Sequence, residues 1–180
     1  MIRNLQVLLW VLISFSVSGQ KFMSERGFIK FYSQATIEDI TARNEKATAL
    51  FDAGTGSIAF VVPINKFEFA KSLMKEHFNE KYLESERYPK STFQGRVIGY
   101  NPETTTEQSV TAQGKLTIHG VTKDVETTGT LKVNGGKIDA NSTFNVLISD
   151  YNIKIPAVVK DKVSNTIKIT VDCDLEPLKS

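Results

Sequence analysis

Apolar and polar residues alternate along most of the chain after residue 19, with a period of two. The clearest runs lie at 58–64, 110–118, 121–133, 138–148 and 167–175. This alternation is typical of strands that have one apolar face and one face in water. Shorter and less regular runs are also expected to be strands, and they lie at 28–33, 36–42, 46–51 and 91–98.

Turn residues separate these runs. Asn134-Gly135-Gly136, between two alternating runs, is the strongest hairpin signal in the chain, and His119-Gly120 marks another tight reversal. Many short strands with few helices between them favour an antiparallel all-β fold. Because closing the sheet removes both of its exposed edges, we expect an antiparallel eight-stranded β-barrel.

One segment, 69–82, has apolar residues at helical rather than strand spacing. The stripe consists of Phe69, Leu73, Met74, Phe78 and Tyr82. It predicts one amphipathic helix inserted between strands. A second short helix is expected near 157–163, just after Pro156.

The first 19 residues have the composition of a secretory signal peptide. A basic start with Arg3 is followed by an apolar run at 5–13 and by small residues up to Gly19. The alternative is a membrane anchor, but the run is shorter than the about 20 residues that span a bilayer. We therefore expect cleavage before Gln20, one domain over 20–180, no integral membrane span afterwards, and a periplasmic or secreted protein.

Composition and charge exclude several classes of function. The formal net charge is only +2, from 22 Lys and Arg against 20 Asp and Glu, which gives no general attraction to nucleic acid. Cys173 is the only cysteine, so the chain has no intramolecular disulfide and no cysteine-rich metal site. Its place on the apolar face of a strand predicts a buried, inert thiol.

The remaining polar residues form no recognisable catalytic motif. His77 and His119 have no metal-ligand spacing, and no nucleophile, phosphate-binding or dinucleotide-binding motif is present. We therefore expect no metal, no cofactor and no enzymatic activity. For His119 an exposed turn position is favoured over a contact with a ligand head group.

Small residues stand among the positions expected to face inward. Ala112, Gly114, Gly129, Ala140 and Ser142 could leave a cavity, or equally mark close strand packing. The residues most suited to contact a flexible apolar ligand, or otherwise to cap the barrel, are Phe60, Phe69, Leu73, Met74, Phe78, Phe93 and Leu116.

Two basic residues are candidate partners for a phosphate head group. They are Arg96 and Lys123, the latter an exception on the otherwise uncharged face of its run. Both are equally suited to be solvated strand residues.

Several segments resemble the YceI-like family. Residues 116–123, LTIHGVTK, resemble its hallmark L-T-[IL]-x-G-V-T-[KR], and 88–93, YPKSTF, resemble its Y-P-x-x-x-F segment. Residues 54–60 resemble the strand that precedes the family's helix. These landmarks follow in family order over 27–177; Asp124 departs from the pattern, because many members have proline there.

The resemblance implies a lipocalin-like barrel in a periplasmic or secreted bacterial protein. Residues 150–156, DYNIKIP, resemble a form found in Bacteroidetes-type members. The family resemblance also implies that a long isoprenoid lipid, polyprenyl or quinone-type, binds inside the barrel without any chemistry. The alternative is an envelope structural or interaction module with a filled barrel and no lipid ligand. A third hypothesis is a hydrolase or isomerase on the same fold. The sequence leaves the oligomeric state open.

Overall fold

Strands make up most of the computed structural model, which describes residues 20–34, 39–156 and 163–178. The strands are β1 (Lys21–Ser33), β2 (Ile40–Asp52), β3 (Ser57–Pro63), β4 (Glu68–Phe69), β5 (Lys90–Ile98), β6 (Gln108–Ile118), β7 (Val121–Asn134), β8 (Lys137–Leu147) and β9 (Thr166–Pro177). The helical elements are η1 (Ile64–Lys66), α1 (Ser72–His77), η2 (Phe78–Tyr82) and η3 (Ile148–Tyr151).

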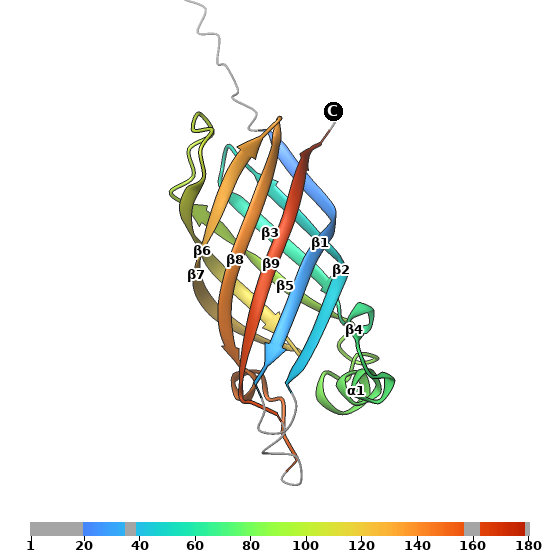
Figure 1. Ribbon diagram of the computed structural model, residues 1–180. Helices are drawn as coiled ribbons and strands as arrows, with labels where there is room; N and C mark the ends of the chain where they lie inside the picture. Colours follow the sequence, from blue (N-terminus) through green and yellow to red (C-terminus); the bar gives the residue numbers. More distant parts are fainter. Residues whose placement is uncertain (1–19, 35–38, 157–162, 179–180) are drawn as a thin grey trace, which may run out of the picture.

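Eight of these strands close into one antiparallel barrel (Figure 1). Their order around the barrel is β1-β9-β8-β7-β6-β5-β3-β2, and β1 pairs with β2 to complete the circle. The short strand β4 pairs only with β2, through Ala42 and Phe69. The prediction of an all-β, lipocalin-like eight-stranded barrel is therefore confirmed.

The expectation of two strands at 36–42 and 46–51 is wrong, because β2 is a single strand. The inward-facing position changes phase within it, from Ala42 and Asn44 to Ala47. The side chain of Asn44 is fully buried: its Nδ2 donates to the carbonyl of Pro63, and its Oδ1 accepts from the Lys46 N–H, each at 2.8 Å. A strand that bulges in this way looks like two runs in the sequence.

The facing strand β1 contains irregularities at the same level. Its register against β2 shifts between Ser24 and Gly27 and again between Gly27 and Ile29. Alternation counted back from residue 33 therefore stops at residue 28, whereas the strand begins at Lys21.

The inserted helix is shorter than the expected 69–82. It comprises 11 residues, with α1 continuing into the π-helical turn η2, and it lies at the end of the barrel opposite the chain's C-terminus (Figure 1). Phe69 belongs instead to β4. The second expected helix, near 157–163, falls almost wholly outside the described residues, as does the segment 1–19 expected to be a signal peptide.

Both predicted tight reversals are present. Gly135 and Gly136 connect β7 to β8 and have φ values of 58° and 82°. His119 and Gly120 connect β6 to β7 and have φ values of 51° and 74°. Two successive left-handed residues match the twist that the flanking strands require.

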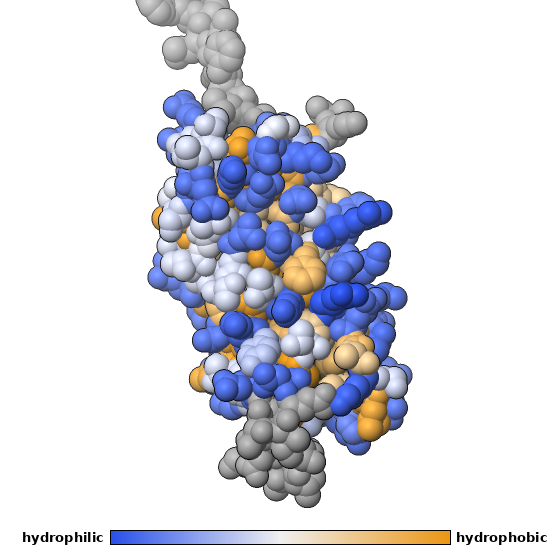
Figure 2. Space-filling model, viewed as in Figure 1, coloured by the Kyte–Doolittle hydropathy of each residue, from blue (hydrophilic) through white to orange (hydrophobic). Residues whose placement is uncertain are grey.

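The apolar side chains form two packed clusters along the barrel. One fills the end where the chain's C-terminus lies and includes the fully buried Phe51, Ile138 and Leu175. The other lies toward the inserted helix and includes Phe31 and Phe67. The outer surface viewed in Figure 2 is mainly hydrophilic, with apolar residues scattered among the polar ones.

We predict that Gly120→Ala destabilises the barrel by about 2–4 kcal/mol, measured by denaturant unfolding. A left-handed alanine costs about 1–2 kcal/mol, and its Cβ would come within 2.5 Å of the Tyr88 ring, which adds an overpacking cost. Gly135→Ala is the matched control, since no atom lies within 4 Å of its new Cβ. Equal losses in the two variants would show that the Tyr88 contact does not matter.

We also predict that Cys173 does not react with thiol reagents in the folded protein at pH 8. Its side chain is 1% exposed, and burial raises the pKa of the thiol to about 12. Complete labelling is expected only after unfolding in guanidinium. Rapid labelling under native conditions would contradict the buried position.

Candidate ligand-binding cavity

The barrel encloses a cavity of about 530 Å³. Every one of the eight barrel strands contributes to its wall, as do Ile64, Met74, Phe78 and Ile148 from the helical elements. This volume lies in the range that small-molecule and cofactor sites occupy. The barrel is therefore not filled, contrary to what the alternative hypothesis expects.

Six of the seven residues predicted to contact a ligand line this cavity. They are Phe60, Phe69, Met74, Phe78, Phe93 and Leu116. The seventh, Leu73, does not line it, and Leu73 is 58% exposed on the outside of the helix. Met74 and Phe78 are four residues apart and share the helix face that looks into the barrel, whereas Leu73 lies beside that face.

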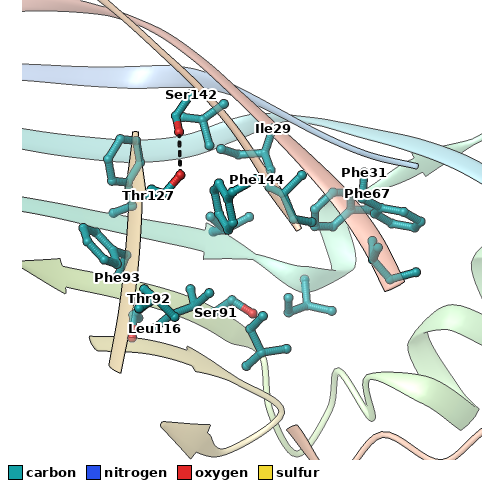
Figure 3. A pocket seen from close by; sticks show the side chains of 18 of the residues that line it. Ile29, Phe31, Phe67, Ser91, Thr92, Phe93, Leu116, Thr127, Ser142 and Phe144 are labelled. Carbon is teal, nitrogen blue, oxygen red and sulfur yellow. Dashed lines mark hydrogen bonds between the residues drawn. The ribbon is translucent and has the colours of Figure 1, made fainter. Parts of the chain in front are cut away.

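Four phenylalanine rings pack together where the helix meets the barrel. Phe31, Phe67, Phe69 and Phe78 have ring centroids 5.0–5.7 Å apart in five pairs. This aromatic cluster fastens β1 and β4 to the helix and forms one end of the cavity. Figure 3 shows Phe31 and Phe67 together at that end, Phe144 nearer the middle of the view and Phe93 on its far side.

Sequence reasoning did not select Phe31 and Phe67 for the cavity. Phe31 alternates with polar residues in β1, so its inward direction was available from the pattern. Phe67 follows the single turn η1, where no periodicity reports which way a side chain points.

The lining is almost entirely apolar, and its polar groups are mostly hydroxyls and amides. None of the described residues that line it is Asp, Glu, Lys or Arg. Ser142 Oγ donates to the carbonyl of Thr128 at 2.7 Å and lies 3.4 Å from Thr127 Oγ1 (Figure 3). Burial raises the pKa of the lining Tyr82, so that phenol is neutral at neutral pH. The interior is thus suited to an uncharged, apolar ligand.

The expectation that His119 is an exposed turn residue is wrong. Its side chain is 10% exposed, with Nδ1 3.2 Å from the Tyr151 carbonyl and Nε2 3.3 Å from Glu84 Oε1. The Tyr88 ring packs edge-on against it at 4.6 Å. His119 does not line the cavity; it ties the β6–β7 turn to η3 and to the segment after the helix.

The two basic candidates occupy different places. Arg96 Nη2 donates to the Thr55 carbonyl at 2.9 Å, and Arg96 stands directly opposite Ser57 on the outside of the barrel. Lys123 stands opposite the cavity-lining Leu116 and is solvent-exposed. Of the pair, only Lys123 is on the strand face that forms the cavity wall.

The described residues show neither a metal-binding cluster nor a membrane-spanning helix. Within them, no three His, Cys, Asp or Glu side chains gather where they could hold a metal ion. No helix among these residues has the length and apolar character needed to cross a membrane.

Comparison with known proteins relates this architecture to a family. Among curated proteins no sequence matches. A polyisoprenoid-binding domain from Saccharophagus degradans superposes with a TM-score of 0.74 at 14% identity, covering 89% of this chain and 99% of that one. BcnA of Burkholderia cenocepacia superposes with a TM-score of 0.65 at 16% identity, covering 83% of this chain and 94% of that one. The YceI protein of Campylobacter jejuni superposes with a TM-score of 0.63 at 16% identity, covering 82% of this chain and 90% of that one. The YceI-like domain model matches residues 17–175, and the chain therefore belongs to the YceI-like family.

Proposed function

We propose that this protein binds a long isoprenoid lipid, polyprenyl or quinone-type, inside the barrel and carries or sequesters it without chemistry. The observation that carries the proposal is the apolar cavity of about 530 Å³, whose described lining has no carboxylate, ammonium or guanidinium group. Family membership and the polyisoprenoid-binding domain among the similar structures support the choice of lipid.

Hydrophobic burial supplies the binding free energy in this proposal. Each buried methylene contributes about 0.8 kcal/mol, so ten contribute about 8 kcal/mol before ordering costs. Before those costs are subtracted, this free energy is that of a roughly micromolar complex, and a longer tail adds to it. Phenylalanine and methionine side chains around the cavity provide surfaces that adapt to a flexible chain.

The arrangement of polar groups supports binding rather than catalysis. His119 is held by a carboxylate, as a catalytic base would be, but both of its ring nitrogens face protein acceptors and its ring lies outside the cavity lining. Cys173 is buried, and burial favours its neutral thiol over the nucleophilic thiolate.

Native mass spectrometry followed by solvent extraction tests the proposal. Protein purified from its own host should carry a stoichiometric extra mass that extracts as a prenyl lipid. Ala112→Phe, which places a large ring in the cavity, is expected to lower affinity for an added prenyl lipid by about tenfold or more.

The matched control for that variant is Thr111→Phe, which adds the same ring to the opposite face of β6. It should leave lipid affinity unchanged. A protein without bound lipid that takes up none of the added prenyl lipids would refute the proposal, as would equal losses in the two variants.

We also propose that the protein works in the bacterial envelope, as a periplasmic or secreted protein. The support is the basic start, apolar run and small residues of the first 19 positions. The mass of the protein recovered from the periplasmic or extracellular fraction should correspond to a chain that begins at Gln20. Recovery of the full-length chain from the cytoplasm would contradict this location.

A further inference from the structure

The pairing between β7 and β8 covers only half of each strand. From the hairpin at Gly135-Gly136 it runs as far as Gly129 opposite Ser142. Beyond that point β7 continues to Val121 on its pairing with β6 alone, and β8 continues to Leu147 on its pairing with β9 alone. The barrel wall therefore contains a split between residues 121–128 of β7 and 143–147 of β8.

The split is bounded at both ends by side-chain interactions. At the end nearer the Gly135-Gly136 hairpin, the Ser142 hydroxyl donates to the Thr128 carbonyl at 2.7 Å, where the next ladder bond would otherwise form. At the end nearer the β6–β7 turn, η3 lies against β7, and the Tyr151 carbonyl is 3.2 Å from His119 Nδ1. The unpaired stretch thus lies between two points at which β8 and the η3 turn that follows it contact β7 and the turn before it.

The cavity reaches this split from inside. Val125 and Thr127 on β7 and Phe144 on β8 line the cavity along the two edges of the split. Thr130 and Asn141, which stand opposite one another beside it and face outward, also touch the cavity. We call this unpaired stretch the slot: along it no backbone ladder between β7 and β8 separates the cavity lining from the outer surface.

Lys123 lies on β7 beside this slot. Its neighbour across the β6–β7 pair is Leu116, a cavity-lining residue, so Lys123 is on the inner face of the strand. Among the described barrel strands it is the one charged residue on that face. Its side chain is exposed, and no hydrogen bond or ion pair holds it within the described residues, whereas Lys115 and Asp124 pair at 2.8 Å on the outer face.

The charges of the site determine where an amphiphile's head group can lie. An anion would lose its hydration inside a lining whose described residues include no lysine or arginine, so the head group stays at the edge of the cavity. An exposed ammonium beside an apolar slot is a suitable partner for a phosphate oxygen. We propose that the slot is a lateral mouth of the cavity, through which an isoprenoid tail inserts while Lys123 binds its anionic head group. This inference rests on the proposed isoprenoid binding.

Two lipids with the same tail test the head-group contact. A polyprenyl monophosphate and the polyprenol of equal length are compared by titration with wild-type protein and with Lys123→Gln. The variant should bind the phosphate about tenfold more weakly, because a hydrogen bond to a charged group is lost, and the polyprenol equally well. Lys132→Gln, an exposed lysine on the outer face of the same strand, is the control and should change neither affinity.

The outcomes separate this inference from the function on which it rests. An unchanged preference for the phosphate in Lys123→Gln, or equal losses for both lipids, overturns the head-group site. Failure of wild-type protein to bind either lipid refutes isoprenoid binding itself.

Cross-linking tests the lateral route. Thr128→Cys with Thr143→Cys places a thiol on each edge of the slot, to be joined by reagents of increasing length. The joined protein should take up lipid more slowly than the same variant before joining. Asn145→Cys with Lys168→Cys joins β8 to β9, which are already paired, and is the control. Unchanged uptake after the slot is joined overturns the lateral route; the buried Cys173 does not compete for the reagent.

Discussion

The pairing of β1 with β2 is the interaction on which the rest of the structure depends. These two strands are the ends of the sheet β1-β9-β8-β7-β6-β5-β3-β2, and their contact closes the strand order into a barrel. Closure satisfies backbone groups that would otherwise form two open edges, and it gives every strand one face toward a common interior. The register shifts near Gly27 and the phase change at Asn44 lie on this seam, so the strands bend there without losing their inward apolar face.

The distribution of side-chain sizes inside this wall produces the cavity. Large side chains fill one end, around Phe51, and the aromatic cluster packs the end beneath the helix. Between these ends the inward positions include Ala112, Gly129 and Ser142, which are too small to meet across the barrel. The cavity thus follows from where small residues occur in β6, β7 and β8. A ligand that binds the folded barrel alone would add to its stability by mass action.

Alternation predicted most of this fold because it reports directly which face of a strand is buried. Alternation does not indicate which strand pairs with which. It continues through 121–133, although β8 pairs with only about half of β7. It also misreads a bulge as a gap, as in β2. Helical spacing selected Met74 and Phe78 correctly for the cavity but included Leu73 at the border of the stripe. The burial of His119 depends on Glu84, Tyr88 and Tyr151, which only the tertiary structure brings to it.

The side chains packed toward each end of the barrel bear on how a long chain reaches the interior. Passage beneath the helix would separate the rings of the aromatic cluster, at about 0.5–1.5 kcal/mol for each of its pairs. Passage through the opposite end would disrupt fully buried side chains such as Phe51 and Leu175. The slot between β7 and β8 requires neither, because its ladder hydrogen bonds are already unmade and the Ser142 hydroxyl occupies the Thr128 carbonyl at its edge. The side of the barrel is therefore the route that leaves both packed ends of the described structure intact.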